Sequence, residues 1–449
     1  MNFSFNIIKN VTSLIFSYQI HFFLITALLL GVARLILPYD YFIATSLITV
    51  CILSYRLEIL TKARYRLDLP LTSISRLLLG LLLLSILFSI LLTSELDLPR
   101  SESYLVLLVS VTLYLLTFHL ISHVSDRKLN QFCLGIILFL NLLLILFASS
   151  SLFSTSYYPR KFSFIPEEIY KILPPPRSIE DGGYNPNYFP ALIVILLPTS
   201  LVWWVFPKKR ELPKWLKWLT LVGVVTSSFM LILLQSRASL TAVVISFLIL
   251  LILRLPLSIK LLSKSIPVLL LILIFVFIYP ESLQSIIRDF GNPFGYSFIE
   301  RNRMWLYGWL MLNDFMFTGS GIVEKSGIVH LFYPKLNFEE FSLVYLHNVF
   351  LEIVADVGIF GLISWLSLWA TTSVGAWFAY KSHHLLLSAL GAALLATQWG
   401  ILIHQLFEAQ TWTDLKSSLL VWLVWGVAMG IGFRAKCLQK PECSRSTES

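Results

Sequence analysis

Charged residues and cysteines are both scarce in this sequence. Only 13% of its 449 residues are Asp, Glu, Lys or Arg, and only four are Cys. Apolar residues make up 57% of the chain and the mean hydropathy is +0.79, which lies outside the range of soluble globular domains. The four cysteines lie in or beside apolar runs or in the C-terminal tail, with no spacing typical of a disulfide framework or a metal site. The composition therefore predicts a chain that lies in a lipid bilayer.

Short strands of alternating polar and apolar residues are also lacking, which excludes a membrane β-barrel and leaves helices as the spanning structure. A hydrocarbon core of roughly 30 Å needs about 20 apolar residues in a helix. We therefore predict an all-α, polytopic integral membrane protein with about twelve transmembrane helices. The predicted spans are 20–37, 40–55, 76–93, 103–124, 132–153, 188–206, 218–235, 239–257, 265–280, 348–380, 384–406 and 418–434.

The spans and the segments between them divide the chain into regions. The first span is too long for a signal peptide and has no small-residue cleavage site after it, so we expect it to remain uncleaved. Two long loops stand out, and the larger one separates the ninth and tenth helices. The predicted regions are a five-helix membrane region at 1–153, a loop at 154–187, a central membrane region at 188–280, the large loop at 281–346, a C-terminal membrane region at 347–434 and a tail at 435–449.

Basic residues predict the orientation. With twelve spans, the Lys- and Arg-rich segments 55–75, 207–217 and 435–449 all fall on one side of the membrane. Short cytoplasmic connections are enriched in Lys and Arg, so these segments and both termini are predicted to be cytoplasmic, and the two long loops extracytoplasmic. The net charge of +9 is explained by anionic lipid headgroups beside these short connections. We therefore expect membrane lipids and no nucleic acid as partners.

Two basic segments lie at the predicted outer side, where a charge near hydrocarbon needs an explanation. Arg237 separates two apolar runs, and its guanidinium can bind phosphate through paired hydrogen bonds; the alternative is an arginine that extends to the membrane surface. In the large loop, Arg301 and Trp305 would share one face of a helix while Arg303 points elsewhere. The alternative there is an amphipathic helix on the membrane surface.

A histidine opens the tenth span. On a regular helix with about 100° per residue, Gly358 and Gly361 fall near the face of His347, which predicts close helix packing along that face. Asp356 would lie about 13 Å deeper than His347, where a carboxylate must be paired or line water. His347 is a candidate catalytic base, and the neighbouring Asn348 a candidate substrate-binding residue; an interfacial histidine with satisfied hydrogen bonds is the alternative.

Two further polar sites lie at predicted helix ends. His404 and Glu408 are one turn apart near the outer end of the eleventh span, where they can hydrogen-bond each other. A purely structural pair at the helix end is the alternative. Asn187 is predicted as the N-cap of the sixth span, where exposed backbone amides can also hold an anion.

These segments together resemble the bacterial O-antigen ligase and polymerase superfamily over about residues 185 to 410. The ligase pattern matches His347 and Asn348, followed after nine residues by Gly358 and after two more by Gly361. Other segments similar to the family are Asn185-Pro186-Asn187, Gln235-Ser236-Arg237, and Arg301 with Trp305, Asp314 and Gly319-Ser320-Gly321. Met316 departs from the family, which often has proline at that place.

The resemblance implies an enzyme of the bacterial cytoplasmic membrane. Such proteins take a glycan from an undecaprenyl-diphosphate carrier at the outer face and attach it to a sugar hydroxyl, without a metal or another cofactor. By this resemblance Arg237, Arg301 and His347 are the catalytic residues. The expected substrate-binding residues are Asn187, Arg303, Trp305, Asn348, His404 and Glu408.

Three alternatives stay open at this point. Ligase and polymerase differ in their acceptor, a lipid-core sugar or the end of a growing glycan, and the sequence does not separate them. The residues His404, Phe407 and Glu408 are also similar to a branch described as inorganic-carbon transporters, although two matching halves with broken helices, typical of many transporters, are not visible. A non-catalytic assembly subunit would leave Asp356 and the basic residues unexplained.

Overall fold

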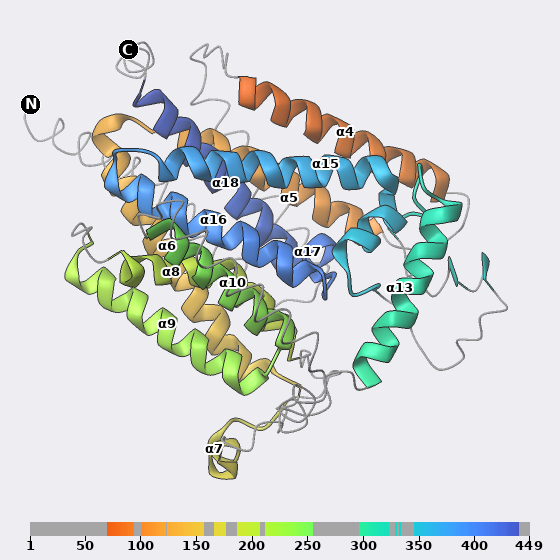
Figure 1. Ribbon diagram of the computed structural model, residues 1–449, viewed down its shortest axis with the longest axis horizontal. Coiled ribbons are helices and arrows are strands. Elements are labelled where there is room, and N and C mark those ends of the chain that lie inside the picture. Colours follow the sequence, from red (N-terminus) through yellow and green to blue (C-terminus); the bar gives the residue numbers. More distant parts are fainter. Residues whose placement is uncertain are drawn as a thin grey trace, which may run out of the picture.

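The computed structural model describes ten stretches of the chain, and every secondary-structure element in them is a helix (Figure 1). The described residues are 70–93, 101–122, 124–156, 166–176, 186–206, 212–254, 296–322, 328–329, 332–333 and 345–439. The helices are α4 (Pro70–Thr93), α5 (Ser101–Ser122), α6 (Asp126–Ser154), α7 (Glu167–Ile172), α8 (Tyr188–Val205), α9 (Lys214–Leu234), α10 (Arg237–Arg254), α13 (Tyr296–Asp314), α15 (Val349–Tyr380), α16 (Leu385–Gln405), α17 (Gln410–Thr413) and α18 (Leu415–Cys437).

Eight of these helices are long and apolar enough to cross a membrane, and the apolar part of α5 is shorter. The all-α, polytopic membrane class predicted from the sequence is therefore confirmed. Three of the twelve predicted spans, 20–37, 40–55 and 265–280, lie outside the described residues. Each of the other nine coincides with a helix of the structure, and the total of about twelve remains a prediction.

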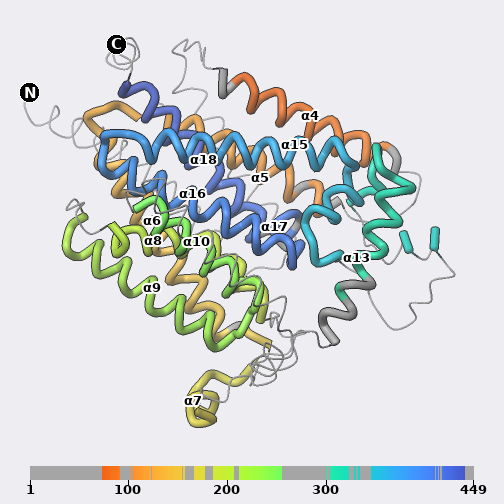
Figure 2. Tube along the Cα trace, in the orientation of Figure 1, coloured from red at the N-terminus to blue at the C-terminus, as the bar shows by residue number. Residues whose placement is uncertain are grey.

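The long helices form one bundle, in which α16 and α18 lie inside (Figures 1 and 2). Helix α18 packs between α5 and α15, while α16 packs against α8, α10 and α15. Helix α4 covers the outer side of α15, and α9 lies against α6 and α8. Small residues permit a close crossing of α15 and α18, since a Cβ added to Gly432 of α18 would collide with the backbone of Gly375 of α15.

Basic residues gather at one end of this bundle. There Arg434, near the end of α18, pairs with Asp126 at the start of α6. Lys436 lies 3.7 Å from the ring centroid of Phe378, near the end of α15. The opposite end holds the starts of α10 and α15 and the end of α16 (Figure 1). The basic residues at or near the helix termini of the first end are Arg127, Lys128, Lys214, Lys217, Arg254, Lys381, Arg434 and Lys436.

Candidate functional site

Helix α13 brings Arg301 to the end of the bundle opposite the basic residues. Its apolar side chains Tyr307 and Met311 are buried against Leu346 and Ala355, which form a small hydrophobic cluster separate from the main core. This packing holds α13 across the first part of α15 (Figure 1). The segment predicted from Arg301 and Trp305 is therefore helical and docked on the bundle.

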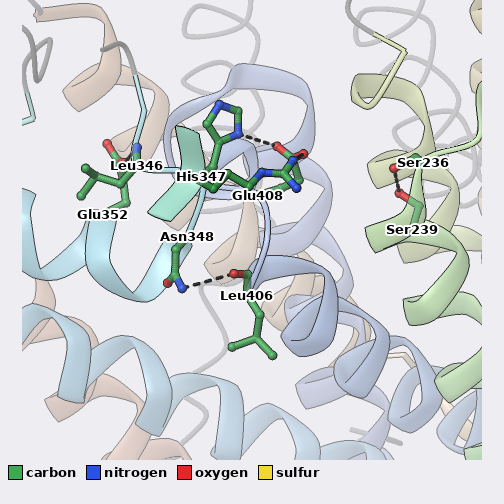
Figure 3. A network of polar contacts seen from close by, with 9 residues as sticks. Ser236, Ser239, Leu346, His347, Asn348, Glu352, Leu406 and Glu408 are labelled. Atoms are coloured by element: carbon green, nitrogen blue, oxygen red, sulfur yellow. Dashed lines mark hydrogen bonds and ion pairs between the residues drawn. The ribbon is translucent and has the colours of Figure 1, made fainter. Parts of the chain in front are cut away.

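The carboxylate of Glu408 joins Arg301 to His347. Nη2 of Arg301 donates to Oε1 of Glu408 at 2.8 Å. Nδ1 of His347 lies 3.0 Å from Oε2 of the same carboxylate. A dashed line marks this contact in Figure 3. The side chain of Glu408 is only 2% exposed, against 21% for Arg301 and 33% for His347. One buried anion thus holds two side chains that remain reachable from solvent.

The surroundings of Glu408 keep it ionised. Burial raises the pKa of its carboxyl, but the hydrogen bond from His347 and the charges of His347, Arg301 and His404 outweigh burial and hold that pKa below its ordinary value. An ionised carboxylate only accepts hydrogen bonds, so Nδ1 of His347 carries a proton. In a neutral His347 the other ring nitrogen, Nε2, is then an acceptor.

The backbone of His347 has φ of +50°, in the left-handed region. Its two neighbours hold this uncommon conformation in place. The amide N–H of Leu346 donates to Oε2 of Glu352 at 2.7 Å. Asn348 is the N-cap of α15, because its Oδ1 accepts from two amides of the first turn, and its Nδ2 donates to the carbonyl of Leu406 at 3.2 Å (Figure 3). The loop that presents His347 is therefore fixed on both sides.

Two details of the predicted His347 face are wrong. Helix α15 begins at Val349, so His347 lies outside the helix and the angular argument does not apply. The helix is also interrupted at Gly358, which has φ of 75° and ψ of −179°. At Gly361 another helix does approach, because an added Cβ would lie 3.7 Å from Cβ of Ser85 of α4, which is an ordinary contact distance. The deeper carboxylate of Asp356 is paired as expected, since it accepts from Nε1 of Trp412 at 2.8 Å.

The predicted hydrogen bond between His404 and Glu408 is also absent. Helix α16 ends at Gln405, and a tight turn follows in which the amide of Phe407 bonds to the carbonyl of His404. The spacing of one helical turn is therefore lost, and Glu408 reaches Arg301 and His347 instead. In the described part of the chain, Nε2 of the buried His404 has no hydrogen-bond partner.

The remaining predicted site residues lie at the same end of the bundle or on α13. Arg237 is exposed and is the first residue of α10, which packs against α16. Asn187 occupies the predicted N-cap position of α8, although its side chain makes no capping hydrogen bond. Trp305 is half-buried on α13, and the side chain of Arg303 lies outside the described residues.

The bridge made by Glu408 is the feature that the sequence did not predict. Arg301 and His347 precede Glu408 by 107 and 61 positions, so no spacing rule joins them. The available signal was a carboxylate at the outer end of an apolar span, a place where an anion needs a cationic partner. Among the described residues, no group of three His, Cys, Asp or Glu is placed to hold a metal ion.

Part of the chain matches a known protein family. The family described as O-antigen ligase matches residues 222–366, a segment that contains Arg237, Arg301 and His347 but ends before Glu408. This match confirms the resemblance to the O-antigen ligase and polymerase superfamily. No curated protein matches the chain.

Proposed function

Because residues 222–366 of this multi-pass membrane protein match the O-antigen ligase family, we propose that it transfers a glycan from an undecaprenyl-diphosphate carrier to a sugar hydroxyl. The observation that carries this proposal is the pair formed by Arg301 and His347 on one buried carboxylate, that of Glu408. The pair combines a binder of anions with a proton acceptor, which are the two groups that such a transfer needs.

Arg301 and Arg237 act on the donor. When the bond between the sugar and the diphosphate breaks, negative charge grows on the leaving oxygen, and guanidinium groups held in place stabilise it. A guanidinium has five N–H donors, and the bond to Glu408 uses one on Nη2 of Arg301. The group can therefore bind phosphate while Glu408 still fixes its position.

His347 acts on the acceptor. The acceptor oxygen attacks the anomeric carbon of the donor sugar, the bond from that carbon to the diphosphate oxygen breaks, and the hydroxyl proton passes to Nε2 of His347. Glu408 supports this step because it accepts from Nδ1 and stabilises the imidazolium that forms. The two guanidinium groups supply positive charge beside the leaving group, so the proposed reaction is independent of a metal ion.

Reconstitution of the purified protein tests the function. In proteoliposomes that contain an undecaprenyl-diphosphate glycan, we expect transfer to an added acceptor, with undecaprenyl diphosphate as the second product and no loss of rate in EDTA. A lipid-core oligosaccharide and a second glycan serve as separate acceptors, and the preferred one distinguishes ligase from polymerase. The comparisons give no support to the inorganic-carbon transporter.

Helix α10 offers a matched pair of variants for this assay. Arg237 begins the helix at the end that holds the site, and Arg254 ends it at the basic end. We expect Arg237→Ala to lower transfer by about 100-fold or more and Arg254→Ala to leave it unchanged. If the Arg237→Ala protein transfers glycan at the wild-type rate, this residue has no part in the proposed mechanism. If the wild-type protein transfers no glycan to any acceptor, the proposed function is wrong.

The site lies on the extracytoplasmic side in this proposal, because the opposite end of the bundle carries the basic residues typical of the cytoplasmic side. Ile172 of α7 is 83% exposed, and α7 is tied to the site end by the hydrogen bond from Gln235 to Tyr170. Leu438, at the other end, is 40% exposed. In a variant whose native cysteines are replaced by serine, an impermeant maleimide added to spheroplasts should label Ile172→Cys, and Leu438→Cys only after lysis. The reverse pattern would place the site in the cytoplasm.

A further inference from the structure

The turn after α13 is joined to α15 where that helix is interrupted. Because Gly358 has ψ of −179°, the carbonyls of Ala355 and Asp356 lose the helical amides that would otherwise bond to them. Amides of the turn replace them: Ser320 N donates to the carbonyl of Ala355 at 2.6 Å, and Gly321 N donates to that of Asp356 at 3.0 Å. The turn after α13 thus satisfies both carbonyl groups at the break in α15.

The exchange of hydrogen bonds runs in both directions. Ile359 N, the first amide after the break, donates to the carbonyl of Met316 at 2.7 Å. The hydroxyl of Ser320 adds a bond to the carbonyl of Ala355 at 2.9 Å. Non-helical backbone inside a membrane protein is tolerated where its polar groups are satisfied by protein, so these bonds permit the break. We call residues 316–321 together with residues 355–359 the glycine splice.

Each half of the glycine splice contains a glycine that the other half requires. A Cβ at Gly319 would collide with the backbone carbonyl of Asp356, and a Cβ at Gly358 would collide with that of Phe317. Both glycines also have positive φ, 68° and 75°, which L side chains disfavour. Two independent properties, space and backbone conformation, therefore demand glycine at both positions.

The turn is continuous with the helix that carries Arg301. The amide of Phe315 bonds to the carbonyl of Met311, and the amide of Gly319 to that of Phe315, both at 2.8 Å, so the helical path leads directly into the splice. Arg301 lies about 20 Å from the end of α13 at 1.5 Å per residue. Over that length a tilt of about 5° moves Arg301 by about 2 Å, enough to break its 2.8 Å bond to Glu408.

The apolar cluster beneath α13 does not by itself fix the position of α13 along α15. Contacts between apolar side chains are non-directional, whereas the backbone bonds of the splice, at 2.6 to 3.0 Å, fix the position of α13 along α15. We infer that the glycine splice is a positioning element, which sets Arg301 of α13 against His347 and Glu408. Its effect on transfer rests on the proposed function, while its effect on the placement of α13 does not.

The placement of α13 can be measured without any assay of activity. Spin labels at Leu306→Cys and Ile363→Cys report the distance between α13 and the part of α15 beyond the break, and both positions are more than half exposed. We expect Gly319→Ala to broaden the distance distribution or to shift it by about 1 Å, because Leu306 lies about 12 Å from the end of α13 and a tilt of about 5° moves it by about that amount. Gly80→Ala is the matched control, because a Cβ at Gly80 of α4 has no atom within 4 Å.

Transfer should follow placement. A displacement of about 1 Å can lower a reaction rate by about 100-fold, so we expect a fall of this order in kcat for Gly319→Ala and no change for Gly80→Ala. Ser320→Ala keeps every backbone bond of the splice and loses only the hydroxyl bond to Ala355. It is the milder variant in case Gly319→Ala does not fold, with an expected fall of roughly three- to tenfold.

The outcomes separate the two proposals. If the distance distribution and kcat of both Gly319→Ala and Ser320→Ala match those of the wild-type protein, the glycine splice is not a positioning element. If Gly319→Ala shifts the distance but the wild-type protein transfers no glycan, the splice stands and the proposed function fails. If the distance shifts while kcat stays at the wild-type value, the splice places α13 but the placement of Arg301 does not limit transfer, which overturns the inference.

Discussion

Replacing His347 by alanine is expected to lower the rate of glycan transfer by about 10²- to 10⁴-fold, the contribution typical of a general base. The expectation follows from the position of the ring, whose Nδ1 is bonded to the buried carboxylate of Glu408 while the side chain stays one-third exposed. The loss should appear in kcat, because the proton of the acceptor moves only during the reaction. Rates measured in proteoliposomes at saturating donor and acceptor test this.

The control for this variant is another histidine of the same chain. His383 is exposed in the turn between α15 and α16, at the end of the bundle away from the site. Replacing it by alanine should leave kcat and KM unchanged. A His347→Ala protein that is monodisperse in detergent and transfers glycan at the wild-type rate would show that another group takes the proton.

Glu408→Gln is the second variant with a large expected effect, although glutamine has nearly the same shape. The carboxylate accepts from both Arg301 and His347. A glutamine whose oxygen accepts from Arg301 turns its NH₂ group toward Nδ1 of His347, which must then accept a hydrogen bond. The proton moves to Nε2, and the histidine can no longer take the proton of the acceptor through that atom. We expect kcat to fall by about 10²- to 10⁴-fold, as for an acidic partner of a catalytic histidine.

The tautomer of His347 distinguishes a catalytic role of Glu408 from a purely structural one, because a structural role would leave the tautomer unchanged. Nitrogen NMR of labelled histidine should show the proton on Nδ1 of His347 in the wild-type protein and on Nε2 in Glu408→Gln. If the variant keeps the wild-type tautomer and still loses activity, Glu408 acts through Arg301 alone. Asp414→Asn is the matched control, because the carboxylate of Asp414 accepts from Tyr188 and Ser417.

The pH dependence of stability has a defined sign. The pKa of Glu408 is below its ordinary value of 4.5, so the ionised group stabilises the folded protein above about pH 4.5, and this stabilisation is lost as the pH falls through the lower folded-state pKa. The difference in Tm between the wild-type protein and Glu408→Gln should therefore be steady near neutral pH and shrink below about pH 4.5. A difference that grows on acidification would contradict the assigned charge state.

Hydropathy predicted most of the described bundle, because length and apolarity determine which segments can cross a membrane. It did not predict the interruption of α15, since Gly358 lies in an apolar run that reads as one continuous helix. The break depends on bonds to residues 316–321, which are distant in sequence. The positive φ of Gly358 depends on the segment that packs against it as much as on the glycine itself. Hydropathy carries no information about that segment.

The candidate site was predictable residue by residue but not as a network. His347 was found as a polar residue that opens an apolar run, and Arg301 as a basic residue of the large loop that shares a helix face with Trp305. Their meeting on Glu408 depends on how α13 crosses α15 and on α16 ending at Gln405. Both are results of tertiary packing. The spacing of His404 and Glu408 predicted that they bond to each other. Because α16 ends in a turn before Glu408, this carboxylate instead bonds to Arg301 and His347, which are distant in sequence.

The bridge at Glu408 also implies an order of assembly during translation. Arg301 precedes Glu408 by 107 residues and His347 precedes it by 61. At roughly 5 to 20 residues per second, Arg301 leaves the ribosome about 5 to 20 s before the carboxylate that pairs with it. Helices α13 and α15 are therefore synthesised while the arginine still lacks this counter-ion, and a nascent chain that stops before residue 408 lacks both the completed site and the inner helix α18.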